Sequence, residues 1–222
     1  MFLWHPVSGL SGVDTPEVDA QTLRDLTPDE VRRAATITDQ VRRAEFLSGS
    51  QLAREVVQSA LDVDRGSISI DRTCADCGGP HGRPVIRPVT REGAHVSGDL
   101  SISHSAGWTV VAFVSDGRVG IDIEDRSRSL GIESVARRIL HPDEYGDGRC
   151  HDRDALAHTW VQKESILKAS GEGIRLPMWG MYLSQNRLEK WDAHPEYVGK
   201  VELSALEAPP GLIGATALIP PL

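Results

Sequence analysis

Two carboxylates alternate with isoleucines in a short apolar segment near the middle of the chain. The segment Val119–Glu124 has the sequence VGIDIE. Successive side chains of a strand point to opposite faces, so Asp122 and Glu124 would share one face. Neighbouring carboxylates repel each other, and Mg²⁺ would compensate them because it takes oxygen ligands from a few carboxylates and from substrate phosphates. The segment therefore predicts either a solvated strand face or a divalent-cation site.

A third carboxylate precedes a lysine by four residues farther along the chain. In the segment Trp160–Lys168, WVQKESILK, helical spacing puts Glu164 and Lys168 on one face together with Trp160. One interpretation is an exposed ion pair worth roughly 0.3–0.5 kcal/mol. The other is a third metal ligand followed, one turn later, by a lysine that reaches a phosphate. The spacing alone favours the exposed ion pair.

The hydrophobic pattern predicts the elements that position these residues. Thr27-Pro28-Asp29-Glu30 is typical of a helix start, with a hydroxyl cap, an early proline and acids in the first turn. An extended lead-in is expected before about Val18. Helices are expected at about 38–61, 133–140 and 152–170, and strands at about 67–70, 100–103, 108–114, 119–124, 198–203 and 212–219.

Each half of the chain thus shows helices followed by strands, with a break near Asp116. The composition, 40% hydrophobic with 21 glycines in 222 residues, is that of a globular protein. We predict an α+β fold of two similar lobes, an N-terminal lobe over 1–116 and a C-terminal lobe over 117–222.

The charge balance restricts the partners. With 24 basic and 32 acidic residues the net charge is −8, which argues against broad nucleic-acid binding. A polyanionic ligand would need a local basic pocket, and the windows 31–54 and 72–91 are both rich in arginine. The N-terminus has no basic region typical of a signal peptide, and the longest apolar run, Val110–Val114, is too short to cross a membrane. A cytoplasmic protein with no membrane association is expected.

Three motifs occur in a fixed order: Ser103-His104-Ser105, then GIDIE ending at Glu124, then WxxKESxxK ending at Lys168. This ordered set resembles the phosphopantetheinyl transferases of the surfactin-synthetase-activating type. The resemblance extends over roughly residues 27–180. It also includes TPDE at 27–30, LAR at 52–54, GRP at 82–84, GEG at 171–173 and LP at 176–177.

The resemblance implies a pseudo-dimer of two α+β lobes with coenzyme A in the cleft between them, and a monomeric chain. Such an enzyme moves the 4′-phosphopantetheine arm of coenzyme A to a serine hydroxyl of an apo acyl or peptidyl carrier protein. Adenosine 3′,5′-bisphosphate is released, and Mg²⁺ is the cofactor. Which carrier protein is modified does not follow from the motifs.

The resemblance also implies roles for individual residues. Asp122, Glu124 and Glu164 would hold Mg²⁺, and Lys168 would contact the pyrophosphate. Glu164 would also be the base for the serine proton, either directly or through a metal-bound water. The positions expected to contact coenzyme A are Arg83, Ser103, His104, Lys163, Lys168 and Arg43.

Several positions depart from the pattern of the family. Ser101 stands where asparagine is usual, Arg83 replaces lysine, and Glu45 occupies a position where a basic residue is common. The last departure leaves the arginine for the 3′-phosphate open, with Arg43 as the candidate. Glu144 matches a recurrent glutamate, for which helix capping and catalysis are equally good interpretations.

Two other function classes remain as alternatives. A metal-dependent phosphoesterase or nuclease could use the same carboxylates and lysine, although Ser103-His104 and Gly82-Arg83-Pro84 would then have no role. A non-catalytic carrier-binding protein would be favoured if any of the carboxylates or Lys168 were missing, and all are present.

Cys74, Cys77 and His81 have the spacing of half a zinc knuckle. Three candidate ligands are one short of a closed structural site, and Cys150-His151 could supply a fourth only if it folded nearby. We therefore expect reduced cysteines in a turn, with no zinc.

Overall fold

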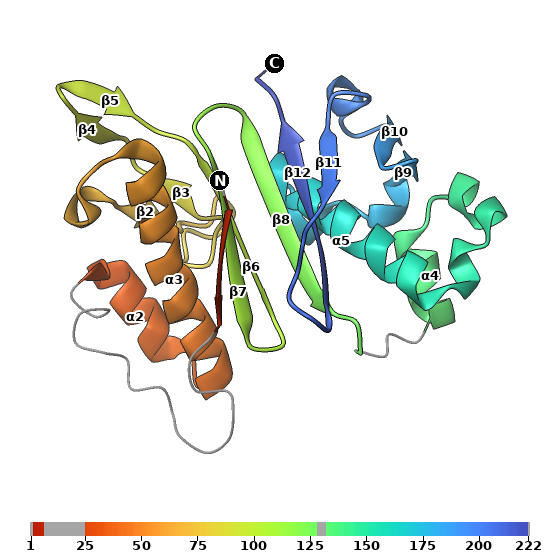
Figure 1. The fold of residues 1–222 in the computed structure, drawn as a ribbon, viewed down its shortest axis with the longest axis horizontal. Helices are drawn as coiled ribbons and strands as arrows, with labels where there is room; N and C mark the ends of the chain where they lie inside the picture. The colour runs from red at the N-terminus through yellow and green to blue at the C-terminus, as the bar shows by residue number, and fades with distance from the viewer. Residues whose placement is uncertain (1, 7–24, 128–131, 222) are drawn as a thin grey trace. The chain divides into compact units, whose positions relative to one another are not determined.

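The computed structural model describes residues 2–6, 25–127 and 132–221. Within it the chain divides into two compact units, Met1–Asp116 and Gly117–Leu222 (Figure 1). Both contain helices and antiparallel strands, so the α+β class is confirmed.

Two helices lie at the start of the range 25–116 of the N-terminal unit. Helix α2 spans Pro28–Thr36 and starts with the predicted cap: the Thr27 hydroxyl accepts from the Glu30 amide, and the Glu30 carboxylate accepts from the Thr27 amide. Helix α3 spans Gln40–Leu61 and is capped by Asp39, close to its predicted limits.

Helix α3 packs against a three-stranded antiparallel sheet with the order β1-β7-β6 (Figure 1). These strands are β1 (Phe2–Pro6), β7 (Trp108–Val114) and β6 (Asp99–Ser105). The expected lead-in therefore begins with a strand, whereas 7–18 lies outside the described residues. The core between helix and sheet includes Val56, Val57, Leu100, Val111 and Phe113.

Short elements complete this unit. The prediction of a strand at 67–70 is mostly wrong, because a 3-10 turn, η1 (Arg65–Ser67), occupies the start of this segment. Two small hairpins follow, built from β2 (Ile70–Asp71) with β3 (Val85–Ile86) and from β4 (Val89–Arg91) with β5 (Ala94–Val96).

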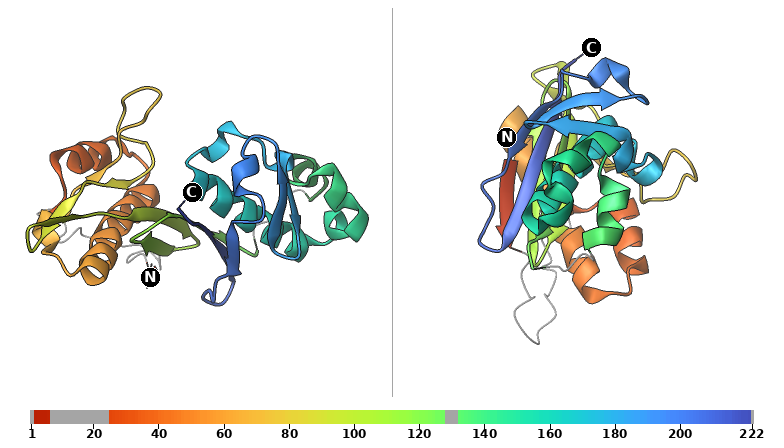
Figure 2. Two further views of the ribbon diagram at one scale, coloured as in Figure 1. Left: turned by 90° about the horizontal axis from the view of Figure 1, so that it is seen from above. Right: turned by 90° about the vertical axis from the view of Figure 1, so that its right-hand side faces the viewer.

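The C-terminal unit is built on an antiparallel sheet with the order β11-β12-β8. Strands β8 (Arg118–Asp125) and β12 (Leu212–Ile219) and helix α5 (Arg153–Ser170) match the predictions. Strand β11 (Glu202–Ala205) begins later than expected, because the 3-10 turn η6 (Pro195–Tyr197) and a turn precede it. Helix α5 lies across one face of this sheet (Figure 2).

The remaining elements of this unit surround the other side of α5. Helix α4 spans Ile132–Ile139, near its predicted position. A hairpin of β9 (Met181–Ser184) and β10 (Arg187–Trp191) was not predicted; Gln185 and Asn186 form its tight turn, both with positive φ. The connecting 3-10 turns are η2 (Pro142–Asp147), η3 (Arg149–His151), η4 (Gly173–Arg175) and η5 (Met178–Gly180).

One glycine sets the distance between α5 and β8. A Cβ atom added at Gly120 would lie 1.8 Å from the carbonyl oxygen of Ser165 and 2.6 Å from the amide nitrogen of Ala169. Residue 120 therefore faces the helix, and only glycine permits this approach. Because side chains alternate along a strand, Asp122 and Glu124 face α5 as well.

No helix in the described ranges combines the length and the apolar composition needed to cross a membrane.

Candidate functional site

Strand β8 brings two predicted site carboxylates under helix α5. Asp122 is 5% exposed and Glu124 is partly buried. In the antiparallel ladder Asp122 lies opposite Ala215, and Glu124 lies opposite Ile213. These apolar neighbours on β12 carry no positive charge that could neutralise the carboxylates.

Lys168 of α5 supplies a positive charge. Its Nζ donates to Asp122 Oδ1 at 2.7 Å and to the carbonyl oxygen of Ile121 at 3.0 Å, and the side chain is 28% exposed. The interpretation of Lys168 as a surface partner of Glu164 on the same helix therefore does not describe its main contacts. The lysine connects helix to strand.

Glu164 lies beside this pair. Burial is the largest influence and raises the pKa of its carboxyl group, and the negative charge of Asp122 raises it further. Lys168 opposes this shift, whereas Glu124 adds to it. The three predicted metal ligands thus share one electrostatic environment, although their oxygen atoms do not all lie within 4.8 Å of one another.

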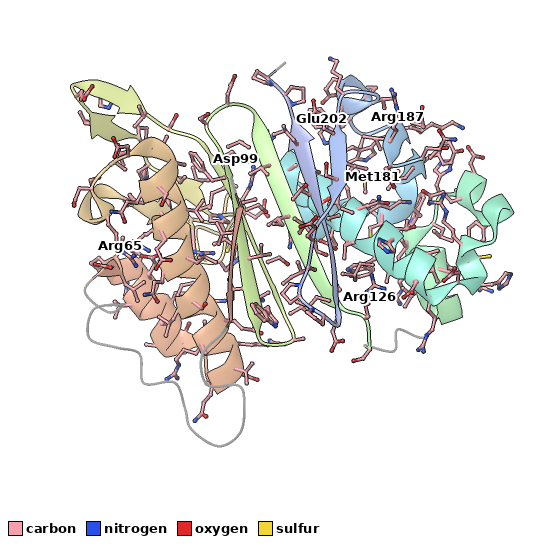
Figure 3. All side chains as sticks on the ribbon, viewed as in Figure 1. Arg65, Asp99, Arg126, Met181, Arg187 and Glu202 are labelled. Carbon is pink, nitrogen blue, oxygen red and sulfur yellow. The ribbon has the colours of Figure 1, made fainter. Side chains whose placement is uncertain are left out.

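Lys163, the other lysine of the motif, has a different environment. It is fully buried, and its Nζ donates to Glu144 Oε2 at 2.6 Å and to the carbonyl oxygens of Ile139 and Met181 at 2.8 and 2.7 Å. Met181 is labelled in Figure 3, at the start of β9. All three ammonium donors are used, so Lys163 has none left for coenzyme A. Burial lowers its pKa to about 8, against the opposing effect of Glu144.

Glu144 is the partner that sequence reasoning left undecided. It is fully buried, and its carboxylate accepts from Lys163 Nζ, from the His141 amide at 2.7 Å and from the Leu183 amide at 2.8 Å. The structure therefore supports the capping interpretation, because Glu144 closes the start of η2 and joins it to β9.

The predicted nucleotide contacts lie in the N-terminal unit, on β6 or next to it. Ser103 is buried within β6, and His104 beside it is 47% exposed, with its Nδ1 3.6 Å from Glu45 Oε2. Arg83 forms an ion pair with Asp99, the first residue of β6, which is labelled in Figure 3. Glu45, the departure from the family pattern, thus lies against His104 of the Ser-His-Ser motif.

Arg43 contacts a different part of the unit, the end of α2. Its guanidinium donates to the carbonyl oxygen of Ile37 at 3.1 and 2.8 Å and so closes the end of α2.

The same unit contains a cavity of about 330 Å³ that the sequence did not predict. Four arginines line it, namely Arg32, Arg33, Arg72 and Arg87, together with the carboxylates of Asp29, Glu30 and Asp71. The arginine-rich windows were the only signal in the sequence that pointed to it.

Arg72 is the most unusual of these arginines. Its guanidinium lies 5.2 Å from the centre of the Phe46 ring, and its Nε is buried without a hydrogen-bond partner. Burial lowers its pKa, and Glu30 opposes the shift. A cationic group that is poorly hydrated in this way favours an anion as a partner.

Comparisons with known proteins agree with the order of the motifs. The model of the 4′-phosphopantetheinyl transferase superfamily matches residues 118–202, from the start of β8 to the start of β11. The 4′-phosphopantetheinyl transferase Sfp of Bacillus subtilis is 32% identical over 136 residues, which are 60% of this chain and 54% of that protein. The 4′-phosphopantetheinyl transferase HetI of Nostoc is 28% identical over 167 residues, 73% of this chain and 67% of that protein.

A phosphopantetheinyl transferase of Thraustochytrium is 29% identical over 165 residues, 67% of this chain and 54% of that protein. The chain matches about half the length of Sfp and of this third relative. The phosphoesterase alternative receives no support from these comparisons. The matched region contains β8 and α5 with their carboxylates and lysines, so this part of the chain is similar to the 4′-phosphopantetheinyl transferase superfamily, and the chain as a whole is similar to its Sfp-like members.

Proposed function

We propose that this protein transfers the 4′-phosphopantetheine arm of coenzyme A to a serine hydroxyl of an apo acyl or peptidyl carrier protein. The observation that carries the proposal is the group formed by Glu164, Asp122 and Lys168 where α5 meets β8. The names of the relatives and the matched family model support the same activity. We further infer that the protein acts as a monomer in the cytoplasm.

The donor set fits Mg²⁺. Asp122, Glu124 and Glu164 offer only carboxylate oxygens, the ligand type that Mg²⁺ prefers. Asp122 and Glu124 both raise the pKa of Glu164, so the three carboxylates are close enough to interact electrostatically. When bound by these residues, Mg²⁺ would neutralise the negative charge on the pyrophosphate oxygens.

Glu164 is the proposed base for the serine proton. A carboxylate with an ordinary pKa is a weak base at neutral pH, and the raised pKa of Glu164 makes it a better proton acceptor. The serine oxygen forms a bond to the β-phosphorus, and the bond from that phosphorus to the bridging oxygen breaks. The proton passes to Glu164, and adenosine 3′,5′-bisphosphate leaves.

Lys168 is the proposed contact to the pyrophosphate. The ion pair with Asp122 and the Ile121 carbonyl oxygen holds its ammonium in place, and the side chain is still partly exposed. A preorganised positive charge of this kind stabilises the negative charge that develops on the leaving group.

Arg83, Ser103 and His104 are proposed for the nucleotide end of coenzyme A, by their match to the family motifs. For the 3′-phosphate, the arginines of the arginine-lined cavity are candidates beside Arg43, which uses two of its five N–H donors on the Ile37 carbonyl oxygen.

Mass spectrometry tests the proposed activity directly. Apo carrier proteins of the fatty-acid, polyketide and peptide types are incubated with coenzyme A, Mg²⁺ and the protein, and the mass added to each carrier is measured. Addition of phosphopantetheine together with release of adenosine 3′,5′-bisphosphate is expected. Cleavage of coenzyme A without modification of any carrier would favour the phosphoesterase instead.

A further inference from the structure

The segment from Arg72 to Gly82 folds back on itself in a tight loop. The Gly82 amide donates to the Arg72 carbonyl oxygen at 2.6 Å, and the Cys74 amide donates to that of Gly79 at 2.8 Å. At the tip, the Gly78 amide donates to the Cys74 carbonyl oxygen at 2.9 Å, and Gly78 has a φ of +70° that favours glycine. The loop has a defined backbone geometry before any ligand is considered.

This loop gathers three potential metal ligands. The sulfur atoms of Cys74 and Cys77 and a ring nitrogen of His81 all lie within 4.8 Å of one another, and Cys77 Sγ is 3.0 Å from His81 Nε2. In a tetrahedral zinc site, bond lengths of about 2.3 Å to sulfur and about 2.0 Å to nitrogen separate the ligand atoms by about 3.5–3.8 Å. Small rotations of the side chains would reach that arrangement.

Backbone amides surround the sulfur atoms of the loop. The amides of Cys77 and Asp76 donate to the Cys74 sulfur. The Gly79 amide lies 3.4 Å from Cys77 Sγ. A Cβ atom at position 79 would be 3.1 Å from the His81 ring and 3.3 Å from Cys77 Sγ, so glycine allows the ring to approach the sulfur.

We propose that Cys74, Cys77 and His81 bind a zinc ion, with the fourth tetrahedral position left to water. A set of two thiolates and one imidazole binds zinc in preference to Mg²⁺ or Ca²⁺. Binding releases the protons of the two thiols and transfers no electrons. This replaces the expectation of metal-free cysteines, which rested on the number of ligands and not on their distances.

The position of the loop gives the zinc ion a structural role. Thr73, Gly78 and Pro80 form part of the wall of the arginine-lined cavity, next to Arg72. At its other end the loop leads directly to Arg83, which pairs with Asp99. A zinc ion would hold both arginines in fixed positions relative to each other. The metal site itself stands whether or not the proposed transfer activity is correct.

Metal analysis of the purified protein tests the proposal without any assay of transfer. The wild-type chain is purified without chelators, incubated with zinc, passed through a desalting column and analysed by mass spectrometry of the elements. We expect about one zinc per chain, as a folded site with three ligands retains its metal. A wild-type protein that is folded by circular dichroism and holds no zinc would overturn the proposal.

Three variants separate the metal site from a redox pair. Cys77→Ser and His81→Asn should both lose the zinc, whereas Cys150→Ser, the third free cysteine, should keep it. A Cys74–Cys77 disulfide would not involve His81. Zinc retained by a folded His81→Asn variant would show that His81 is not a ligand, and would contradict the assignment. If Cys77→Ser fails to fold, the wild-type chain is loaded with cobalt in place of zinc as a second test. A thiolate-to-cobalt absorption band then supports the site, and its absence overturns it.

Discussion

The two lysines of the motif on α5 differ in what they do, although they lie only five residues apart. Lys163 is fully buried and uses all three donors within the C-terminal unit. Lys168 is partly exposed, and its partners are Asp122 and a carbonyl oxygen of β8. Five residues turn the helix by about 140°, so the two side chains leave α5 toward different neighbours. The contacts of Lys163 are therefore structural, and Lys168 is the lysine that we propose for catalysis.

The largest effect is expected for the buried pair. Lys163→Met should lower the free energy of unfolding by about 3–5 kcal/mol, because Glu144 would remain buried without its ammonium partner. Urea denaturation measures the loss. Combining Lys163→Met with Glu144→Gln should recover part of it. Lys190→Met, at an exposed ion pair with Asp143, is the control and should change stability little; equal losses in Lys163→Met and Lys190→Met would remove the distinction between buried and exposed pairs.

The other lysine should show its effect in catalysis. Lys168→Ala should lower the rate of phosphopantetheine transfer by about 10²–10³, or roughly 2.7–4 kcal/mol, because the leaving group loses a preorganised charge. Initial rates at saturating Mg²⁺ measure this, with thermal melting beside them. Lys168→Arg should keep partial activity, since it retains the charge in another geometry. Normal turnover of a folded Lys168→Ala enzyme would assign this lysine to structure as well.

The close contact of α5 with β8 can be disturbed without changing any charge. Gly120→Ala should lower the free energy of unfolding by about 1–3 kcal/mol, because the new methyl group would overlap the Ser165 carbonyl and push the helix away. Transfer activity should fall as well, since Lys168 and Asp122 would separate. Gly180→Ala is the matched control, because nothing lies within 4 Å of the added atom. Similar melting temperatures for both variants would refute the tight contact.

The smallest effect concerns the pH dependence of stability. The pKa of Glu164 is raised above its usual value of 4.5, so between these two pKa values the folded protein binds more protons than the unfolded chain. The free energy of unfolding must then fall as the pH rises through this window. Glu164→Gln has no carboxyl group to ionise at this position, so it avoids this loss of stability. The free energy of unfolding of the variant, relative to that of wild type, should therefore increase from about pH 4 toward neutrality. Denaturation in EDTA at several pH values measures the difference, and a constant difference would speak against the raised pKa.

Local patterns were enough to predict many elements. The hydroxyl cap at Thr27, the helix ended by Gly171 and the apolar strand at 108–114 depend on residues close in sequence, and all three were confirmed. Such features depend on backbone hydrogen bonds and on side-chain periodicity, which neighbouring residues determine. The hairpin of β9 and β10 was missed because its turn, Gln185-Asn186, lacks the glycine that usually marks a two-residue turn.

The sequence by itself determined which residues could do chemistry: the carboxylates of GIDIE, the Glu164–Lys168 spacing and the cysteines with their histidine. Only the tertiary structure decided which partner each of them has. It assigned Lys168 to Asp122, Lys163 to Glu144 and His81 to Cys77. The physical reason is that burial and charge neutralisation depend on atoms brought together from distant parts of the chain, or by the exact course of a loop, and spacing along the sequence does not contain either.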